Sequence, residues 1–149
     1  MVAFAAEIDI AAPPHRVWQV LNDISLESRW MKAARETRFI AGNGYARGAR
    51  MQRRGGFMGY KLDWQSDIVE VVSERLIAFA HSGTVQGSSR WELTPAPGGG
   101  THVRFTSEGP APGPLKWLPA LAATAGRAGL RGDLRRLKQL VEERAKKSG

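Results

Sequence analysis

The feature that most constrains the fold of this chain is a series of segments in which apolar and polar residues alternate. This period-two alternation is typical of β-strands that bury one face. The spacers between the segments are rich in Gly, Pro and polar residues and are too short for a crossover helix, so neighbouring strands must pair antiparallel. The sequence therefore predicts a meander of about six strands, at residues 38–40, 47–54, 60–72, 76–82, 88–94 and 102–107.

A seventh strand and two short helices are predicted before this meander. Residues 3–10 alternate, with isoleucines on one face and acidic residues on the other. Pro13 and Pro14 end this strand because proline cannot donate to a sheet ladder, whereas it fits the first turn of a helix. Two amphipathic helices are therefore expected, at residues 15–22 and 26–32, with these side chains turned inward: Val17, Trp18, Leu21, Leu26, Trp30 and Met31.

The segment from residue 115 onward is predicted to form one long helix. Its apolar residues recur at three- and four-residue steps and would form one buried stripe. Pro119 predicts a kink or a late helix start. No linker is long enough to divide the 149 residues, so we expect a single domain, 1–149. The residues of the expected stripe are Leu115, Leu118, Leu121, Ala125, Leu130, Leu134, Leu137 and Val141.

Three motifs give the chain a resemblance to a known superfamily. They occur in the order IDIAAPPHRVWQVLND, RWELTPAPGGGTHVRF and DLRRLKQLVE. Together they resemble the START/Bet v 1-like (SRPBCC) superfamily, of the polyketide cyclase/dehydrase and lipid-transport type. The resemblance implies an α+β helix-grip fold. In that fold a seven-stranded antiparallel sheet wraps around a long C-terminal helix, and two short helices follow the first strand.

The resemblance leaves two functions open, because one fold hosts many activities. The first is binding of a hydrophobic or aromatic small molecule, lipid- or polyketide-like, in a cavity between the curved sheet and the C-terminal helix. The alternative is a polyketide cyclase/dehydrase-type enzyme that uses general acid/base catalysis in the same cavity. Ile68 stands where the resemblance places an arginine in the aromatase/cyclases. The Tyr-Pro-Phe-Leu-Pro-like signature of quinone-binding relatives is also missing.

Two polar residues are the candidates for catalysis in this predicted cavity. His81 shares a strand face with Ile77 and Phe79, which would place an imidazole in an apolar pocket. Its alternative role is that of a strand-end histidine bonded to backbone or water. Arg53 shares its face with Met51 and would need an anion, a carbonyl group or water as a partner. A register slip of one residue would turn Arg54 inward instead.

The remaining predicted ligand-binding residues come from the same strand faces and from the helices that would close the cavity. A wall that is mostly apolar with a few polar groups is the usual composition of a small-molecule pocket. For part of this set the alternative is that the side chains simply fill the core. The full set is Trp30, Met51, Arg53, Trp64, Ser66, Phe79, His81, Trp91, Phe105, Trp117 and Leu121.

Composition limits the partners and the setting. The net charge of +8 favours contact of the basic surface with anionic lipid or an acidic partner. The arginine-rich stretches lack interleaved aromatic residues for base stacking, which argues against nucleic acid. The chain has no cysteine, so a reducing cytoplasm is the expected compartment. The histidines His15, His81 and His102 lie on separate elements, so no metal site is predicted, and no motif implies a cofactor.

Overall fold

The computed structural model describes residues 2–57, 59–111 and 113–148, and its core is a seven-stranded antiparallel sheet in the order β1-β7-β6-β5-β4-β3-β2. Three α-helices and two 3-10 segments complete the described part of the chain. The elements are β1 Val2–Ile10, α1 Pro14–Leu21, α2 Glu27–Trp30, β2 Ala34–Ala41, β3 Arg50–Phe57, β4 Tyr60–Val72, β5 Leu76–Gly83, β6 Gly87–Ala96, η1 Pro97–Gly99, β7 Gly100–Gly109, η2 Gly113–Trp117 and α3 Pro119–Ser148.

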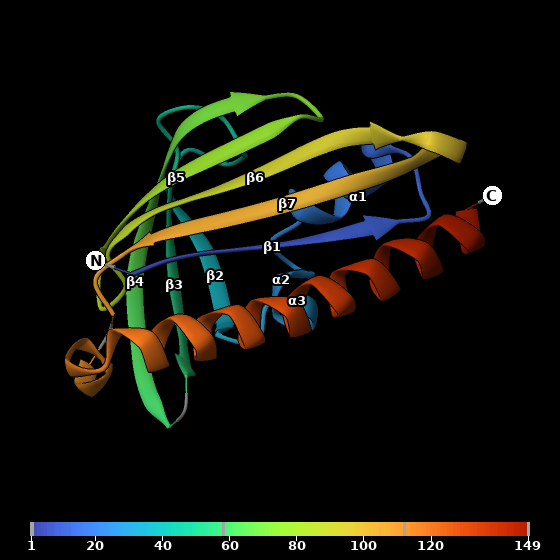
Figure 1. Cartoon of the computed structure of the whole chain (residues 1–149). Coiled ribbons are helices and arrows are strands. Elements are labelled where there is room, and N and C mark those ends of the chain that lie inside the picture. Colours follow the sequence, from blue (N-terminus) through green and yellow to red (C-terminus); the bar gives the residue numbers. More distant parts are fainter. Residues whose placement is uncertain (1, 58, 112, 149) are drawn as a thin grey trace.

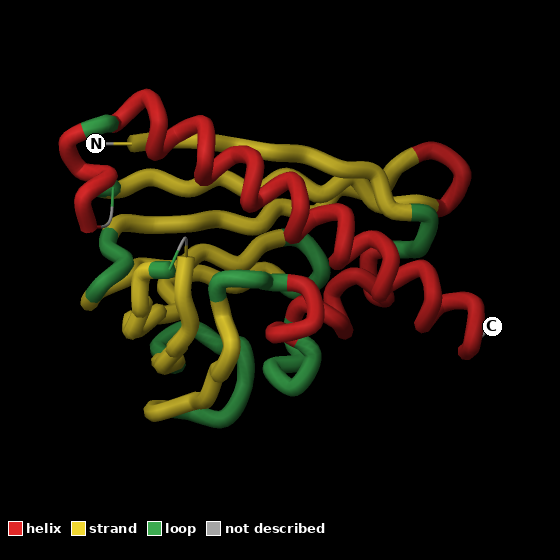
Figure 2. Tube along the Cα trace, turned by 90° about the horizontal axis from the view of Figure 1, so that it is seen from below, coloured by secondary structure: helices red, strands yellow, loops and turns green. Residues whose placement is uncertain are grey.

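The sheet is strongly curved, and α3 runs along its open side (Figure 1). Helices α1 and α2 close one end, where the last turns of α3 also lie (Figure 1). Seen from below, α3 crosses the sheet obliquely, and other strands extend beyond it (Figure 2). The helix-grip arrangement predicted from the sequence is confirmed. None of the helices in the described part of the chain is long and apolar enough to span a bilayer.

From Leu130 onward α3 fills the core with leucine side chains, whereas its large apolar side chains before that point are exposed. Leu130, Leu134 and Leu137 are buried against the sheet. Leu121 and Trp117, both predicted to line the cavity, are instead 52% and 76% exposed. Leu121 lies nine residues before Leu130. Since each residue turns an α-helix by about 100°, Leu121 projects from the opposite face.

The start of α3 explains why the apolar stripe was extended too far. Residues Gly113–Trp117 form η2, and the α-helix begins only at Pro119, as the proline predicted. Trp117 therefore precedes α3, and its exposed ring lies 5.1 Å from Nζ of Lys116. On the sheet side of α3, Ala122 is the buried position two turns before Leu130. A small residue thus occupies the sheet-facing position in the first turn of α3.

The sheet register places Arg53 on the concave face and Arg54 on the convex face. Arg53 pairs with Trp64 across β3 and β4 and is 4% exposed, whereas the side chain of Arg54 is 54% exposed beside Asp63. The alternation predicted for the neighbouring strands has the same phase, so Ser66, Phe79, Ser89 and Trp91 are also buried on the concave side.

Strand β3 differs from its predicted bounds. The glycines of the GGFMG spacer, Gly55 and Gly56, belong to β3. A side chain at Gly55 would place its Cβ 1.8 Å from the carbonyl oxygen of Ala33, and Gly56 N–H donates to that same oxygen at 3.1 Å. These glycines therefore allow the α2–β2 connection to lie directly against β3. From the sequence alone they were interpreted as part of a turn between strands.

Candidate functional site

A buried ion pair anchors a polar network on the concave face. Nε of Arg53 donates to Oε1 of Glu27 at 2.6 Å, and its Nη2 donates to Oε2 of Glu27 at 3.1 Å. The two side chains are 4% and 2% exposed. This two-point geometry is the strongest pairing that an arginine and a carboxylate make. The Glu27 carboxylate thus supplies, from within the same chain, the counter-ion that the buried Arg53 requires.

The Glu27 carboxylate accepts two more hydrogen bonds. The Thr37 hydroxyl on β2 donates to Oε1 at 2.9 Å, and the Tyr45 hydroxyl on the loop before β3 donates to Oε2 at 3.3 Å. Burial, followed by the nearby Glu27 charge, raises the pKa of Tyr45. Burial alone would lower the pKa of Arg53, but Glu27 outweighs that effect and the pKa is raised. Arg53 therefore keeps its positive charge beside the Glu27 side chain.

From Arg53 the network continues across three more strands. Nη1 of Arg53 donates to Oγ of Ser66 on β4 at 2.8 Å. Oγ of Ser66 lies 2.8 Å from Nδ1 of His81 on β5, and Nε2 of His81 lies 2.7 Å from Oγ of Ser89 on β6. We call Glu27, Arg53, Ser66, His81 and Ser89 the polar network. It extends from α2 across the concave face to β6.

His81 is held as a neutral imidazole at physiological pH. Burial is the main cause and the nearby Arg53 guanidinium the lesser one, and together they lower the pKa of His81 to about 4. Its ring stacks on Phe79 with 5.8 Å between ring centroids. The guanidinium carbon of Arg53 lies 5.1 Å from the centroid of that same Phe79 ring. His81 is therefore a hydrogen-bonding group in this site and a weak base near neutral pH.

Solvent reaches the concave face next to Ser89. Phe4, His81, Phe105 and Ser107 are on this face yet remain partly exposed, whereas Phe79, Ser89 and Trp91 beside them are buried. The register places them side by side, since Ser107 pairs with both Phe4 and Ser89. The α3 residues that face the sheet at this end are small, Ala122 and Gly126, whereas Leu130, Leu134 and Leu137 fill the core further along the helix. We call Phe4, His81, Phe105 and Ser107 the opening.

The structure brings most of the predicted binding residues together. Arg53, Ser66 and His81 are linked by hydrogen bonds, and Met51 and Phe79 contact Arg53. The rings of Trp30, Trp91 and Phe105 form a second group, with centroid distances of 5.4 Å and 4.4 Å. Trp64 packs in a separate small cluster with Ala34 and Leu62. Trp117 and Leu121 lie at the surface, outside both groups.

Sequence reasoning missed Glu27 and Tyr45, and the predicted set also leaves out Phe4, Ser89 and Ser107. Glu27 lies beside Leu26 and three residues before Trp30, so it shares the buried side of α2. A carboxylate within a buried helical pattern was the available signal. Tyr45 is on a glycine-rich loop, GNGYARG, and gave no periodic signal. The histidines His15 and His102 are exposed, and His102 bonds Asp9 and Glu7.

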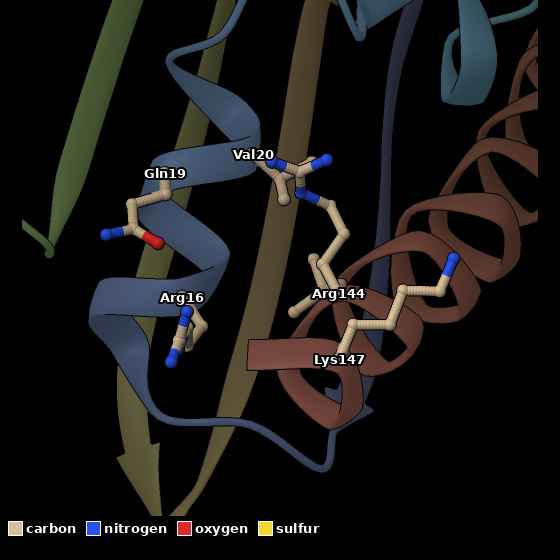
Figure 3. Close-up of a pocket in the computed structure, with 6 residues that line it drawn as sticks. Arg16, Gln19, Val20, Arg144 and Lys147 are labelled. Carbon is tan, nitrogen blue, oxygen red and sulfur yellow. The ribbon is translucent and has the colours of Figure 1, made fainter. Parts of the chain in front are cut away.

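A basic groove lies away from the polar network, between α1 and the end of α3. It has a volume of about 240 Å³ and is lined by Arg16, Gln19, Val20, Val141, Arg144 and Lys147. Figure 3 shows the Arg144 side chain extending from α3 toward Val20 on α1. Its lining includes two valines, and the charged side chains that line it are cationic. This composition suits an anionic group rather than an apolar molecule.

A protein-family comparison decides where the chain belongs. The model of the family described as polyketide cyclase / dehydrase and lipid transport matches residues 1–142. The chain is a member of this family. Members of the family and superfamily differ in activity. The reaction or ligand of this chain must therefore be inferred from the residues of its own site. No curated protein matches the chain significantly.

Several solved structures share the fold of the chain. Protein TTHA0849 from Thermus thermophilus is 23% identical, with a TM-score of 0.78 over 95% of this chain and 97% of the other. A START superfamily protein from Mycobacterium smegmatis is 13% identical, with a TM-score of 0.73 over the same shares. Ara h 8.0201 is 18% identical, with a TM-score of 0.69, also over 95% and 97%. At these identities the likeness concerns the fold alone.

Proposed function

We propose that this family member, acting as one domain of residues 1–149, binds a hydrophobic or aromatic small molecule between the curved sheet and α3. The observation that supports this most directly is the opening, where Phe4, Phe105, Ser107 and His81 face inward yet remain partly exposed. An inward apolar surface that water reaches gains free energy when an apolar ligand covers it. The polar network would address the polar end of that ligand.

Binding is favoured over cyclase/dehydrase-type catalysis by the state of the two catalytic candidates. Arg53 is engaged by Glu27 through two bonds and by Ser66 through a third, so it has little capacity left to polarise a substrate. His81, with its pKa lowered to about 4, is a weak general base near pH 7. The site is thus organised to hold a ligand.

The absence of cysteine keeps the cytoplasm as the proposed compartment.

The proposal is tested by displacement of a neutral apolar dye, N-phenyl-1-naphthylamine, and by native mass spectrometry of the purified protein. We expect saturable dye binding at one site. Ser107→Leu would fill part of the opening and should weaken dye binding at least about tenfold, because the added side chain occupies the space the dye needs.

Ser88→Leu is the matched control, because Ser88 is the exposed neighbour of Ser89 on the other face of β6. It adds the same side chain to the same sheet and should leave dye binding unchanged. Equal loss in both variants, or no saturable binding by the unmodified protein, would contradict the proposed function.

The basic groove supports a second contact, with anionic lipid. Arg16, Arg144 and Lys147 line the groove together with Val20 and Val141. Guanidinium groups can bind two phosphate oxygens at once. Sedimentation with phosphatidylglycerol vesicles should retain the protein at low salt and release it as salt rises. The double substitution Arg144→Glu and Lys147→Glu should abolish retention. Equal retention by phosphatidylcholine vesicles would rule out this contact.

A further inference from the structure

The polar network has a fixed hydrogen-bond direction, because it starts from a group that can only donate. The guanidinium of Arg53 donates from Nη1 to Oγ of Ser66, so that oxygen is an acceptor in this bond. The Ser66 hydroxyl is fully buried and still carries its own proton. The acceptor it contacts is Nδ1 of His81 at 2.8 Å. Ser66 therefore donates to His81.

This direction determines the tautomer of His81. An imidazole that accepts at Nδ1 and is neutral must carry its proton on Nε2. The low pKa of His81 agrees with a neutral ring. Nε2–H then donates to Oγ of Ser89 at 2.7 Å. The donors run in one direction, from Arg53 through Ser66 and His81 to Ser89.

The last hydroxyl of this series has a proton to donate, and the part of the chain that the structure describes offers no acceptor for it. Ser89 is 8% exposed, and among the described residues its hydroxyl bonds only His81. Its cross-strand neighbour Ser107 belongs to the opening. A buried hydroxyl that receives a bond and cannot pass one on is unfavourable unless another acceptor arrives. The Ser89 proton is therefore available to a molecule in the opening.

A second donor on the same side of the core is also without an acceptor. Nε1 of Trp30 is buried and has no hydrogen-bond partner among the described residues. The Trp30 ring meets the ring of Trp91 edge-on at 5.4 Å, and Trp91 lies two residues after Ser89 on the same strand face. Two buried donors and the apolar rings around them favour a ligand that accepts hydrogen bonds.

We propose that Ser89 is the terminal donor of a one-directional hydrogen-bond series, and that the ligand is an apolar molecule with a carbonyl-type acceptor oxygen. The ligand part rests on the proposed function, binding in the opening. Bonds that follow one another in one direction polarise each other, so the Ser89 hydroxyl is a better donor than an isolated serine. A hydrocarbon of the same shape would leave this donor unpaired.

The hydrogen-bond direction is tested without any ligand by nitrogen-15 NMR of the histidine rings. We expect His81 to show an unprotonated Nδ1 and a protonated Nε2 across neutral pH. Ser66→Ala removes the donor at Nδ1 and should shift His81 toward a tautomer mixture. Ser88→Ala, on the exposed face of β6, should leave the tautomer unchanged. A protonated Nδ1 in the unmodified protein would overturn the proposed direction.

The ligand class is tested with fluorenone and fluorene, which share one skeleton and differ in a carbonyl oxygen. Equilibrium dialysis should show fluorenone binding about two- to tenfold more tightly, as expected for one neutral hydrogen bond. Ser89→Ala should remove this preference, while Ser88→Ala should keep it.

The outcomes separate this inference from the proposed function. If both compounds bind equally to the unmodified protein and to Ser89→Ala, the proposed function stands and the acceptor preference is overturned. If neither compound binds and the dye also fails, the proposed function is overturned, and the ligand class with it. The tautomer measurement judges the hydrogen-bond direction in either case.

Discussion

Glu27 is a short carboxylate side chain on the four-residue helix α2, and four donor groups from three other segments converge on it. Removing two charges from water is costly, and their attraction offsets that cost only when the remaining hydrogen-bonding capacity is also met. Arg53, Thr37 and Tyr45 meet it here. The pair therefore fixes how α2, β2 and β3 sit relative to one another and holds Arg53 in line with Ser66.

Glu27→Ala should lower the free energy of unfolding by about 3–5 kcal/mol, because it leaves the Arg53 guanidinium buried without a counter-ion. Urea denaturation monitored by circular dichroism measures the change. Glu36→Ala is the control, since Glu36 is an exposed glutamate on β2, and it should stay within about 0.5 kcal/mol.

The pair can also be replaced as a unit. Glu27→Leu combined with Arg53→Met removes both charges together and should recover most of the loss seen in Glu27→Ala. A Glu27→Ala variant as stable as the unmodified protein would show that Arg53 finds another partner.

At the scale of elements, the first half of α3 is built from residues small enough to lie close to β1. A Cβ on Gly126 would lie 2.7 Å from Cε1 of Phe4, whereas a Cβ on Gly132 would meet only the flexible end of Arg136 at 3.4 Å. Both glycines weaken the helix through backbone entropy. Only Gly126 also allows a close approach to the sheet.

Gly126→Ala and Gly132→Ala should therefore change the stability of the protein in opposite directions. Gly132→Ala should stabilise the protein by about 0.5–1 kcal/mol through helix propensity alone. Gly126→Ala should destabilise it, because α3 or the Phe4 ring must move to accept the new methyl group. Thermal unfolding of the two variants side by side tests this, and two shifts of the same sign would contradict the close contact.

Element by element, sequence predicted what depends on local pattern and missed what depends on distant contacts. Burial of one sheet face requires apolar and polar residues to alternate along each strand. This alternation predicts which residues point inward, including Arg53. The pairing of Glu27 with Arg53 spans 26 residues, and no local pattern carries it. Trp117 was misplaced because the segment that ends at it forms η2 and α3 begins only at Pro119. Leu121 was misplaced because it lies nine residues before Leu130 and projects from the opposite face of α3.

At the scale of the whole molecule, two histidines make stability depend on pH in opposite directions. The pKa of His81 is lowered from 6.5 to about 4. The stability that its neutral ring contributes is therefore fully present above pH 6.5 and is lost as the pH falls toward 4. Hydrogen bonds to Glu7 and Asp9 raise the pKa of the exposed His102. That contribution is present below 6.5 and is lost as pH rises through the raised pKa.

We therefore expect stability to be greatest near the ordinary histidine pKa, with the steeper loss on the acid side. The lowered pKa of His81 changes the free energy of unfolding by at most about 3 kcal/mol, a limit reached when its imidazole is fully protonated in the unfolded chain. Urea unfolding between about pH 4 and 9 should show this profile. His81→Gln should flatten its acid side and His102→Gln its alkaline side. An unchanged acid side in His81→Gln would show that His81 is not buried as a neutral group.

The pairing of β1 with β7 also determines the order in which the chain can fold. Strands β2 to β7 each pair with a neighbour in sequence, whereas Ile10 and its partner Thr101 are 91 positions apart. During synthesis the hairpins from β2 onward can form as they emerge, but β1 must wait for β7 because closing so long a loop is entropically costly. Helix α3 packs mainly on β1. Strand β1 and helix α3, the first and the last of the described elements, are therefore expected to dock together, as the step that completes the fold and forms the opening.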